Sequence, residues 1–511
     1  MTLSSAFSII NSAFDANAAQ TAVISRNISN SSTTGYSLKT ANLATNSYGG
    51  VEVASITRAT NGALQEQMLA ANSQSAQQSA IANGLSQLSA TVSDSSSTSS
   101  SSSTTTASGQ SPSATLANLE TALQNYATSP TDTTVAESVV TAASDLTTSL
   151  NNATTTVQQV RSQADAAMAQ SVTTVNSLLS QFQTVNNTIV SGLRTGADVT
   201  DAEDSRDNIL NQLSQQIGIS TVTNANGSES IYTDSGVTLF QTTPRAVSFT
   251  ATPTLTAGAS GNPVTVDGVP ITGSSSPMAI QSGALAGLAT LRDTTAPQYQ
   301  AQLDQIANGL VNAFAETDQS GSATPGPALP GLFTYAGFSA TTGLPTDANV
   351  PAGLAGQIAV NANVDPSQGG NVNLLRDGDI SGGGANYTYN ATGGASYTTR
   401  IQQLITQMSA TQPFDPSADA GSSDSLMGYA SASVSWVQGQ YQQATDQASS
   451  SSALATAASQ ALSNVTGVNL DAETSQMLSL ENSYQTSAKL LATVNNMFAS
   501  LLTAVTAVAV P

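Results

Sequence analysis

A cluster of carboxylates is the part of this sequence whose residue types and spacing could do chemistry. Its members, grouped within seven residues around Arg206, are Asp201, Glu203, Asp204 and Asp207. Carboxylates this close together can bind a cation or act as general acid and base. A Ca²⁺ loop, however, has oxygen ligands at alternate positions around a turn glycine, whereas this stretch is typical of a helix start, where acidic side chains favour the positive end of the dipole. We therefore predict solvated carboxylates here and no metal site.

Other candidates for chemistry are few. Asp377 and Asp379, in RDGDISGGG, could bind a cation, but their setting is typical of a polar turn. Lys39 and Lys489 lie in the two terminal segments, which argues against a Ser–Lys dyad. The chain has no cysteine and no histidine, which excludes disulfides, thiol nucleophiles and histidine-based triads. We predict no catalytic residue, no cofactor and no metal.

The composition limits the partners that can be expected. The 511 residues are enough for about three or four domains. Only 8% of them are charged and the net charge is −21, whereas about 25% charged is typical of soluble proteins. Because the basic residues are scattered singly from Arg26 to Lys489, we expect neither a nucleic acid nor a membrane as partner.

Neither end of the chain reads as a targeting or membrane segment. The first twenty residues have no basic region and no uninterrupted apolar core, so they do not resemble a cleaved signal peptide. The C-terminal LLTAVTAVAVP comes closest to a membrane span but is shorter than the roughly 18 residues required. The chain is therefore expected to be cytoplasmic or exported without a cleaved signal.

Both ends carry the apolar spacing of amphipathic helices. From Leu3 to Ile28, six of eight positions on one helical face are apolar, and from Met477 to Val508 nine of ten are, in a seam of coiled-coil type. Asn469 can start the C-terminal helix. The opposite faces carry Ser, Thr, Ala and Asn instead of charges. The two helices either pack in an ordinary core or pair with each other and with other copies, in which case frayed termini are expected in the monomer.

Between the ends, the pattern predicts helices, then strands, then helices again. The Ser/Thr-rich stretch 93–106 is expected to be a flexible loop. In chain order, the other expected elements are helices at 60–90, 115–150, 155–195 and 197–218, short strands at 219–280, a helical run from 283 to about 318, an irregular segment at 319–395, and helices at 400–465.

The ends of the chain resemble those of bacterial flagellar axial proteins. NISNSSTTGYS at 27–37 resembles the shared Asn-Asn-Ile-Ala/Ser-Asn-x-x-Thr-x-Gly-Tyr segment, and VTGVNLDAETSQMLSLENSYQTSAKLLATVNNMFASLL at 465–502 resembles the matching tail. In the middle, DAEDSRDNILNQLSQQIGISTV and SGALAGLATLRDTTAPQYQAQLDQIANGLVNAFAETDQSG resemble the hook-associated protein 1 (FlgK) family. Asp318 departs from this pattern, because a histidine is common there.

The resemblance implies a mainly α fold with inserted β structure, elongated and multidomain, with the terminal helices paired as an inner coiled coil. The expected domains are a terminal coiled-coil inner domain (1–45 with 466–511), a helical stem (46–217 with 281–318 and 396–465), a β-rich outer domain (218–280) and an irregular or β insertion (319–395).

The resemblance also implies a structural, non-enzymatic role as a junction ring between flagellar hook and filament, on which the filament assembles. The implied partners are further copies of the chain, the hook protein, the second hook–filament junction protein, and an export chaperone at the C-terminal helix. Export through the flagellar type III channel would place the chain outside the cell. The implied assembly interface comprises Leu3, Phe7, Ile10, Phe14, Ile24, Ile28, Asn30, Gly35, Tyr36, Leu480, Tyr484, Leu491, Val494, Phe498 and Leu501.

Several alternatives stay open at this level. Gly35 permits a positive φ, and Tyr36 suits an interface, but Tyr36 could equally lie in the protein's own core. A hook or rod protein would share both ends and would be mainly β between them. An adhesin or phage-tail fibre would show repeated β motifs, and a carboxylate-based hydrolase would show turnover.

Overall fold

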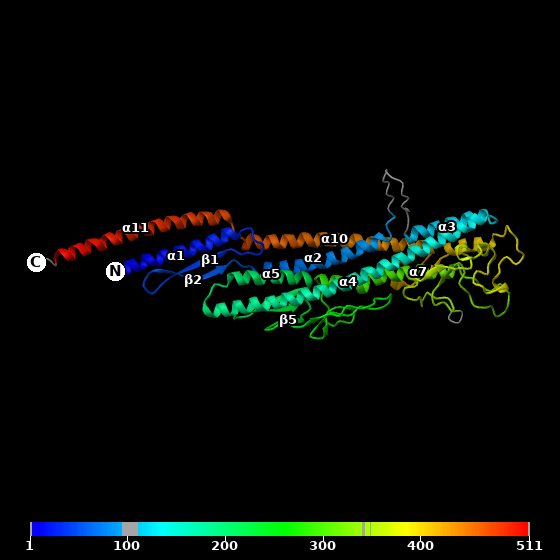
Figure 1. Ribbon diagram of the computed structural model, residues 1–511, viewed down its shortest axis with the longest axis horizontal. Helices are drawn as coiled ribbons and strands as arrows, with labels where there is room; N and C mark the ends of the chain where they lie inside the picture. The colour runs from blue at the N-terminus through cyan, green and yellow to red at the C-terminus, as the bar shows by residue number, and fades with distance from the viewer. Residues whose placement is uncertain (1–2, 95–110, 340–342, 348, 509–511) are drawn as a thin grey trace, which may run out of the picture.

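Three long helices form the stem of an elongated molecule that has both chain ends at one extremity (Figure 1). The computed structural model describes residues 3–94, 111–339, 343–347 and 349–508, so all but two residues of the predicted 93–106 loop lie outside the described part. Helix α2 (Gly62–Ala90) contacts both α4 (Thr133–Thr195) and α10 (Leu426–Thr466). The remaining stem helices are α3 (Pro112–Thr128), α5 (Thr200–Gln216), α6 (Ala284–Thr290), α7 (Ala296–Ala313) and α9 (Thr399–Ser409), with a π turn at Leu291–Thr295 between α6 and α7.

The sequence-based helix boundaries at 115–150 and 155–195 are wrong. The helical structure is interrupted at 129–132 instead, and α4 then continues for 63 residues without interruption. Pro130 lacks the backbone N–H that a continuing helix needs, and Asp132 then caps the new helix by accepting a hydrogen bond from the Thr134 amide at 2.9 Å. The buried face of α4 runs through the expected break, because Leu150, Ala153 and Val157 all pack into the core.

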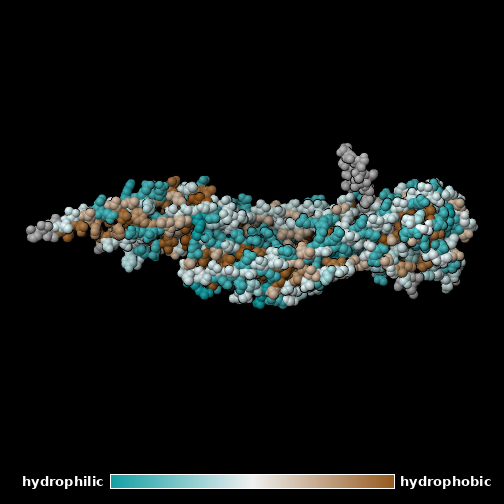
Figure 2. Space-filling view, viewed as in Figure 1, coloured by the Kyte–Doolittle hydropathy of each residue, from teal (hydrophilic) through white to brown (hydrophobic). Residues whose placement is uncertain are grey.

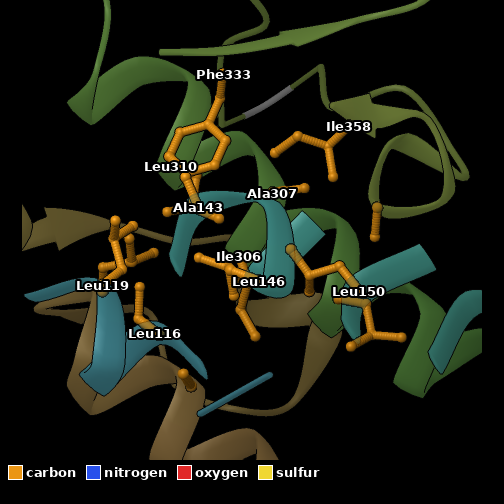
Figure 3. Close-up of a cluster of buried hydrophobic side chains, with 14 of the residues drawn as sticks. Leu116, Leu119, Ala143, Leu146, Leu150, Ile306, Ala307, Leu310, Phe333 and Ile358 are labelled. Atoms are coloured by element: carbon orange, nitrogen blue, oxygen red, sulfur yellow. The ribbon is translucent and has the colours of Figure 1, made fainter. Parts of the chain in front are cut away.

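The larger hydrophobic core lies in the half of the stem away from the chain ends. In Figure 3, side chains of α3, α4 and α7 meet those of two short antiparallel strands, β9 (Phe333–Tyr335) and β10 (Ile358–Val360). Phe333 packs edge-on against Phe314, with ring centroids 5.0 Å apart. Part of the irregular 319–395 segment thus serves as a wall of the core, and it also contains the short helix α8 (Leu374–Asp377).

The expected strands at 219–280 form two small antiparallel sheets. The first contains β3 (Ile219–Thr223), β4 (Glu229–Thr233) and β5 (Thr238–Phe240), and the second contains β6 (Val247–Ser248), β7 (Thr265–Val266) and β8 (Val269–Pro270). A second core cluster joins these sheets to α4, where Phe240 packs edge-on against Phe182. A further pair, β11 (Gln412–Pro413) and β12 (Ser423–Asp424), precedes α10.

Two buried arginines attach the loop between β6 and β7 to the stem. Arg161 donates hydrogen bonds to the carbonyls of Thr256 and Ala259. Arg292, in the π turn, pairs with Asp165, and a Cβ at Gly261 would overlap its guanidinium. The β-rich segment is therefore held by buried, hydrogen-bonded arginines as well as by the core.

A β-hairpin near the N-terminus was not predicted. Strands β1 (Lys39–Thr45) and β2 (Val51–Arg58) pair antiparallel and pack on the N-terminal helix. The Asn46 side chain organises the turn by accepting hydrogen bonds from the amides of Tyr48 and Gly50. The signal was present in the sequence, because VEVASITR is rich in β-branched residues and follows an Asn- and Gly-containing turn.

Candidate assembly interface

The two ends of the chain pair with each other. Helix α1 (Leu3–Asn30) runs antiparallel to α11 (Leu470–Val508), and together with the hairpin they form what we call the terminal unit (Figure 1). Phe14 packs edge-on against Tyr484, with ring centroids 5.0 Å apart. As predicted, Asn469 caps α11, since its side chain accepts hydrogen bonds from the amides of Asp471 and Ala472.

The pairing buries only part of the predicted apolar seam. Ile10, Ile24 and Leu480 are buried. Leu3, Phe14, Ile28, Leu491 and Val494 are half-buried, whereas Phe7, Tyr484, Phe498 and Leu501 are exposed. The exposure of Phe498 and Leu501 follows from length, because α11 has 39 residues and α1 has 28. At about 1.5 Å per residue, α11 is roughly 16 Å longer than α1, and its C-terminal end extends past the start of α1 (Figure 1).

The C-terminal part of α11 exposes a broad apolar surface, which we call the α11 apolar face. Apolar side chains gather over this end of the molecule in Figure 2. The exposed residues of this face are Leu490, Met497, Phe498, Leu501, Leu502 and Val505, each more than half exposed. Monomeric soluble proteins rarely leave a continuous surface of this kind uncovered, so it indicates an interaction site.

This surface corrects one expectation from the sequence. The helical run Leu426–Thr506 contains an 18-residue window that is apolar enough for a membrane span by length and composition, and none of this window is buried. The stretch LLTAVTAVAVP taken alone is shorter than such a window, which therefore includes residues that precede it. Threonine and alanine between the large apolar residues extend the window, since helical threonines such as Thr503 satisfy their hydroxyls on the carbonyl four residues earlier.

Asn27 is the hydrogen-bonding centre of the terminal unit. Its side chain donates to the Lys39 carbonyl at 2.8 Å and accepts from the Lys39 amide at 3.1 Å, which ties α1 to the hairpin. The same amide group donates to the Glu473 carboxylate at 2.9 Å and so connects positions 446 residues apart. Asn27 is only 1% exposed. Asn30, which the resemblance placed in the assembly interface, instead donates a hydrogen bond to the Arg26 carbonyl one turn earlier.

Tyr36 and Gly35 have partners within the chain. The Tyr36 hydroxyl donates to the Asn27 side chain at 2.9 Å, and the Lys39 ammonium lies 4.3 Å from the centre of its ring. Burial raises the pKa of Tyr36. Gly35 has φ +78°, and a Cβ there would overlap the Asn208 side chain. These contacts give the tyrosine and the glycine a role inside the folded chain, whereas their contact with a neighbouring subunit stays a prediction.

Of the four carboxylates predicted to be solvated, only Asp201 is exposed, whereas Glu203 and Asp207 are half-buried and Asp204 is buried. The first 160 residues contain only three basic side chains, Arg26, Lys39 and Arg58, and all three pair with carboxylates at the start of α5. We call these five carboxylates the α5 acidic cluster: Asp198, Asp201, Glu203, Asp204 and Asp207. The cations lie far from these carboxylates in the sequence, so the sequence alone does not show which charges pair.

Burial shapes the electrostatics of this cluster. The Lys39 side chain is fully buried and the Arg58 side chain is 8% exposed. Burial lowers the pKa of Lys39, and the Asp204 carboxylate opposes that change. Asp204 also accepts hydrogen bonds from the Ser37 amide and hydroxyl. Arg206, which the sequence placed at the centre of the group, pairs instead with Glu229 at the start of β4.

Comparisons with known proteins match two separate stretches of the chain. A family model described as the helical domain of the flagellar hook-associated protein FlgK matches residues 99–332. A second, described as the C-terminal domain of the flagellar basal body rod proteins FlgEFG, matches residues 459–504. Residues 99–332 of the chain are thus similar to the FlgK family, and residues 459–504 are similar to the basal body rod proteins. The FlgK family consists of structural proteins of the flagellar hook–filament junction.

One solved structure adds a partial likeness. The flagellar hook junction protein FlgK from Burkholderia pseudomallei is 24% identical, with a TM-score of 0.42, over 53% of this chain and 47% of its own. The match therefore spans about half the length of that protein. No curated protein sequence gives a significant match.

The matches to the two family models fit the fold described above. The helical-domain match begins before α3 and ends before β9, and the C-terminal match covers the end of α10 and nearly all of α11. The predicted mainly helical, elongated fold with small inserted sheets is confirmed. Asp377, the half-buried last residue of α8, pairs with the neighbouring Arg376, and Asp379, just after the helix, accepts a hydrogen bond from the Gly384 amide.

Proposed function

We propose that this chain forms a ring at the junction between flagellar hook and filament, on which the filament assembles. The observation that carries the proposal is the α11 apolar face, which overhangs α1 and has no partner within the described chain. Covering one large apolar side chain is worth about 1.5–3 kcal/mol, so six of them supply a substantial driving force for association. The first partner would be a further copy of this chain, since a ring needs the same contact at every subunit.

Assembly would order the terminal unit while it covers the apolar face. In the free chain, the last eleven or so residues of α11 have no helix beside them, and we expect them to fray in solution. Docking against a neighbour offsets the entropy lost on ordering, which makes the helix stable only in the assembled ring. The filament would thus be built only on a completed junction.

Further partners follow from the same proposal. We propose the hook protein on one side of the ring, the second junction protein on the other, and an export chaperone on α11 before assembly. Export through the flagellar type III channel, without a cleaved signal, would deliver the chain to the outside of the cell. We propose protein and not lipid as the occupant of the α11 apolar face, because no Lys or Arg follows Lys489 to attract lipid headgroups. Neither nucleic acid nor catalytic turnover belongs to this role.

Electron microscopy of cells lacking the gene, with an assay for flagellin in the medium, tests the proposal. Hooks without filaments, with flagellin lost to the medium, are expected. Absence of hooks would favour a hook or rod protein. Normal full-length flagella in a strain with one copy of the gene would overturn the proposal and favour an adhesin.

A further inference from the structure

The terminal unit and the stem do not share a hydrophobic core. Neither of the two core clusters found among the described residues contains a side chain from α1, β1, β2 or α11. Apolar burial, which normally fixes the relative orientation of two packed bodies, is therefore not what sets the orientation here. The relative orientation must therefore depend on other contacts between the two bodies.

The chain crosses between the two bodies only through two short segments. Residues 59–61 lead from β2 into α2, and residues 467–469 lead from α10 into α11. A cavity of about 330 Å³ lies between these crossings, bounded on its third side by the 31–37 loop. Two short connections with open space between them are the geometry of a hinge.

The contacts that bridge the hinge are polar. The Leu38 amide donates to the Thr466 carbonyl at 2.7 Å. Arg26, Lys39 and Arg58 of the terminal unit reach the α5 acidic cluster of the stem. Since the cost of burying these charges offsets most of their attraction, the pairs select one orientation more than they add stability.

We propose that the ion pairs between Arg26, Lys39, Arg58 and the α5 acidic cluster form an electrostatic latch across this hinge. When the latch is closed, it holds the terminal helices at a fixed angle to the stem. When it is released, the terminal unit turns about residues 59–61 and 467–469. Arg58 is the principal cation of the latch, because its guanidinium bonds Glu203, Asp204 and Asp207 together.

Distance measurements between two spin labels on the full-length monomer test the latch. The chain has no cysteine, so Ala453→Cys on α10 and Ser479→Cys on α11, both exposed, place one label on each body. The unmodified latch should give one narrow distance distribution. Arg58→Gln should broaden it and add a second maximum, and about 1 M NaCl should do the same more weakly, because buried pairs are screened less than exposed ones.

Matched variants separate the latch from a general loss of charge. Arg245→Gln removes an exposed arginine that pairs with Asp267 in the β-rich segment, and it should leave the distribution unchanged. Arg58→Lys keeps the charge but not the planar fork, and it should broaden the distribution less than Arg58→Gln does. If Arg58→Gln loses its helical circular dichroism, Asp207→Asn removes the same pair from the stem side and is expected to broaden the distribution.

Two outcomes would overturn the latch. One is a folded Arg58→Gln or Asp207→Asn variant with the narrow distribution of the unmodified chain. The other is a distribution that is already broad when the latch is intact. The measurement uses the free monomer, so its result is independent of whether the chain forms a junction ring in the flagellum.

Discussion

The stem and the terminal unit are both made of long, sparsely charged helices, yet they are held together in different ways. In the stem, α3, α4 and α7 bury Leu119, Leu146 and Leu310 completely in a continuous core. In the terminal unit, α1 and α11 share one incomplete seam, and the polar contacts of Asn27 complete the join. From this difference we expect the stem to be stable by itself and the terminal unit to need a partner.

The largest expected effect is on assembly. Phe498→Asp combined with Leu501→Asp puts two charges on the α11 apolar face, and desolvating them at an interface would cost several kcal/mol. We expect the variant to be absent from isolated flagella while its thermal unfolding stays unchanged, because both side chains are more than half exposed in the monomer. Immunoblots of sheared flagella and a melting curve measure the two quantities.

Ser500→Asp is the matched control, since Ser500 is exposed on the same helix but is not part of the apolar face. It should assemble. Incorporation of the double variant at the level of the control would show that the α11 apolar face is not an assembly surface.

Truncating a leucine should lower the free energy of unfolding much more in the stem than in the terminal unit. Leu146→Ala leaves a cavity in the stem core, where the leucine is fully buried, and should lower the free energy of unfolding by about 2–5 kcal/mol. Leu478→Ala on α11, where the leucine is 62% exposed, should change it by less than about 0.5 kcal/mol. Chemical denaturation measures both, and equal costs would contradict the contrast between a core-joined stem and an open terminal unit.

The stem should respond to pH through Asp304 on α7. Burial raises the pKa of Asp304 to about 6, against the hydrogen bonds it accepts from the amides of Ala355 and Gly353. A folded-state pKa above the unfolded value contributes stability below about pH 4 that is lost as the pH rises through 6. The full effect is about 3 kcal/mol.

The effect of Asp304 on stability is measured as the difference between the unmodified chain and Asp304→Asn. Relative to Asp304→Asn, which has no titrating group there, the unmodified chain should gain stability as the pH falls from 7 to 5. Thermal melts at a series of pH values give this difference. A difference that stays constant over that range would mean that Asp304 does not titrate there.

The smallest effect expected is local to the terminal unit. Asn27→Ala removes the partners of the Lys39 backbone and of Glu473, which should cost about 1–3 kcal/mol. Hydrogen exchange of the α1 amides should speed up while that of α4 does not change, because the two bodies share no core cluster. Asn30→Ala, which removes only a bond within α1, serves as the control. Equal exchange rates in the two variants would show that Asn27 is not the hydrogen-bonding centre of the terminal unit.

Much of the secondary structure could be predicted because it depends on local pattern. Periodic apolar residues predicted both terminal helices, and α2 and the start of α11 lie within two residues of their expected positions. The β1–β2 hairpin was missed because its strands are polar on the exposed face and lie next to a strong helical signal. The break before α4 was misplaced because the buried stripe was given more weight than Pro130.

The chain's own sequence determined which faces are apolar, which family the motifs resemble, and that thiol and imidazole chemistry are impossible. The tertiary structure alone decided which charges meet. Arg26, Lys39 and Arg58 converge on one helix more than a hundred residues away, and Asn27 bonds Glu473 at the other end of the chain. The physical reason is that periodicity is a property of neighbours along the chain, whereas ion pairs and hydrogen bonds depend on distances that only packing sets.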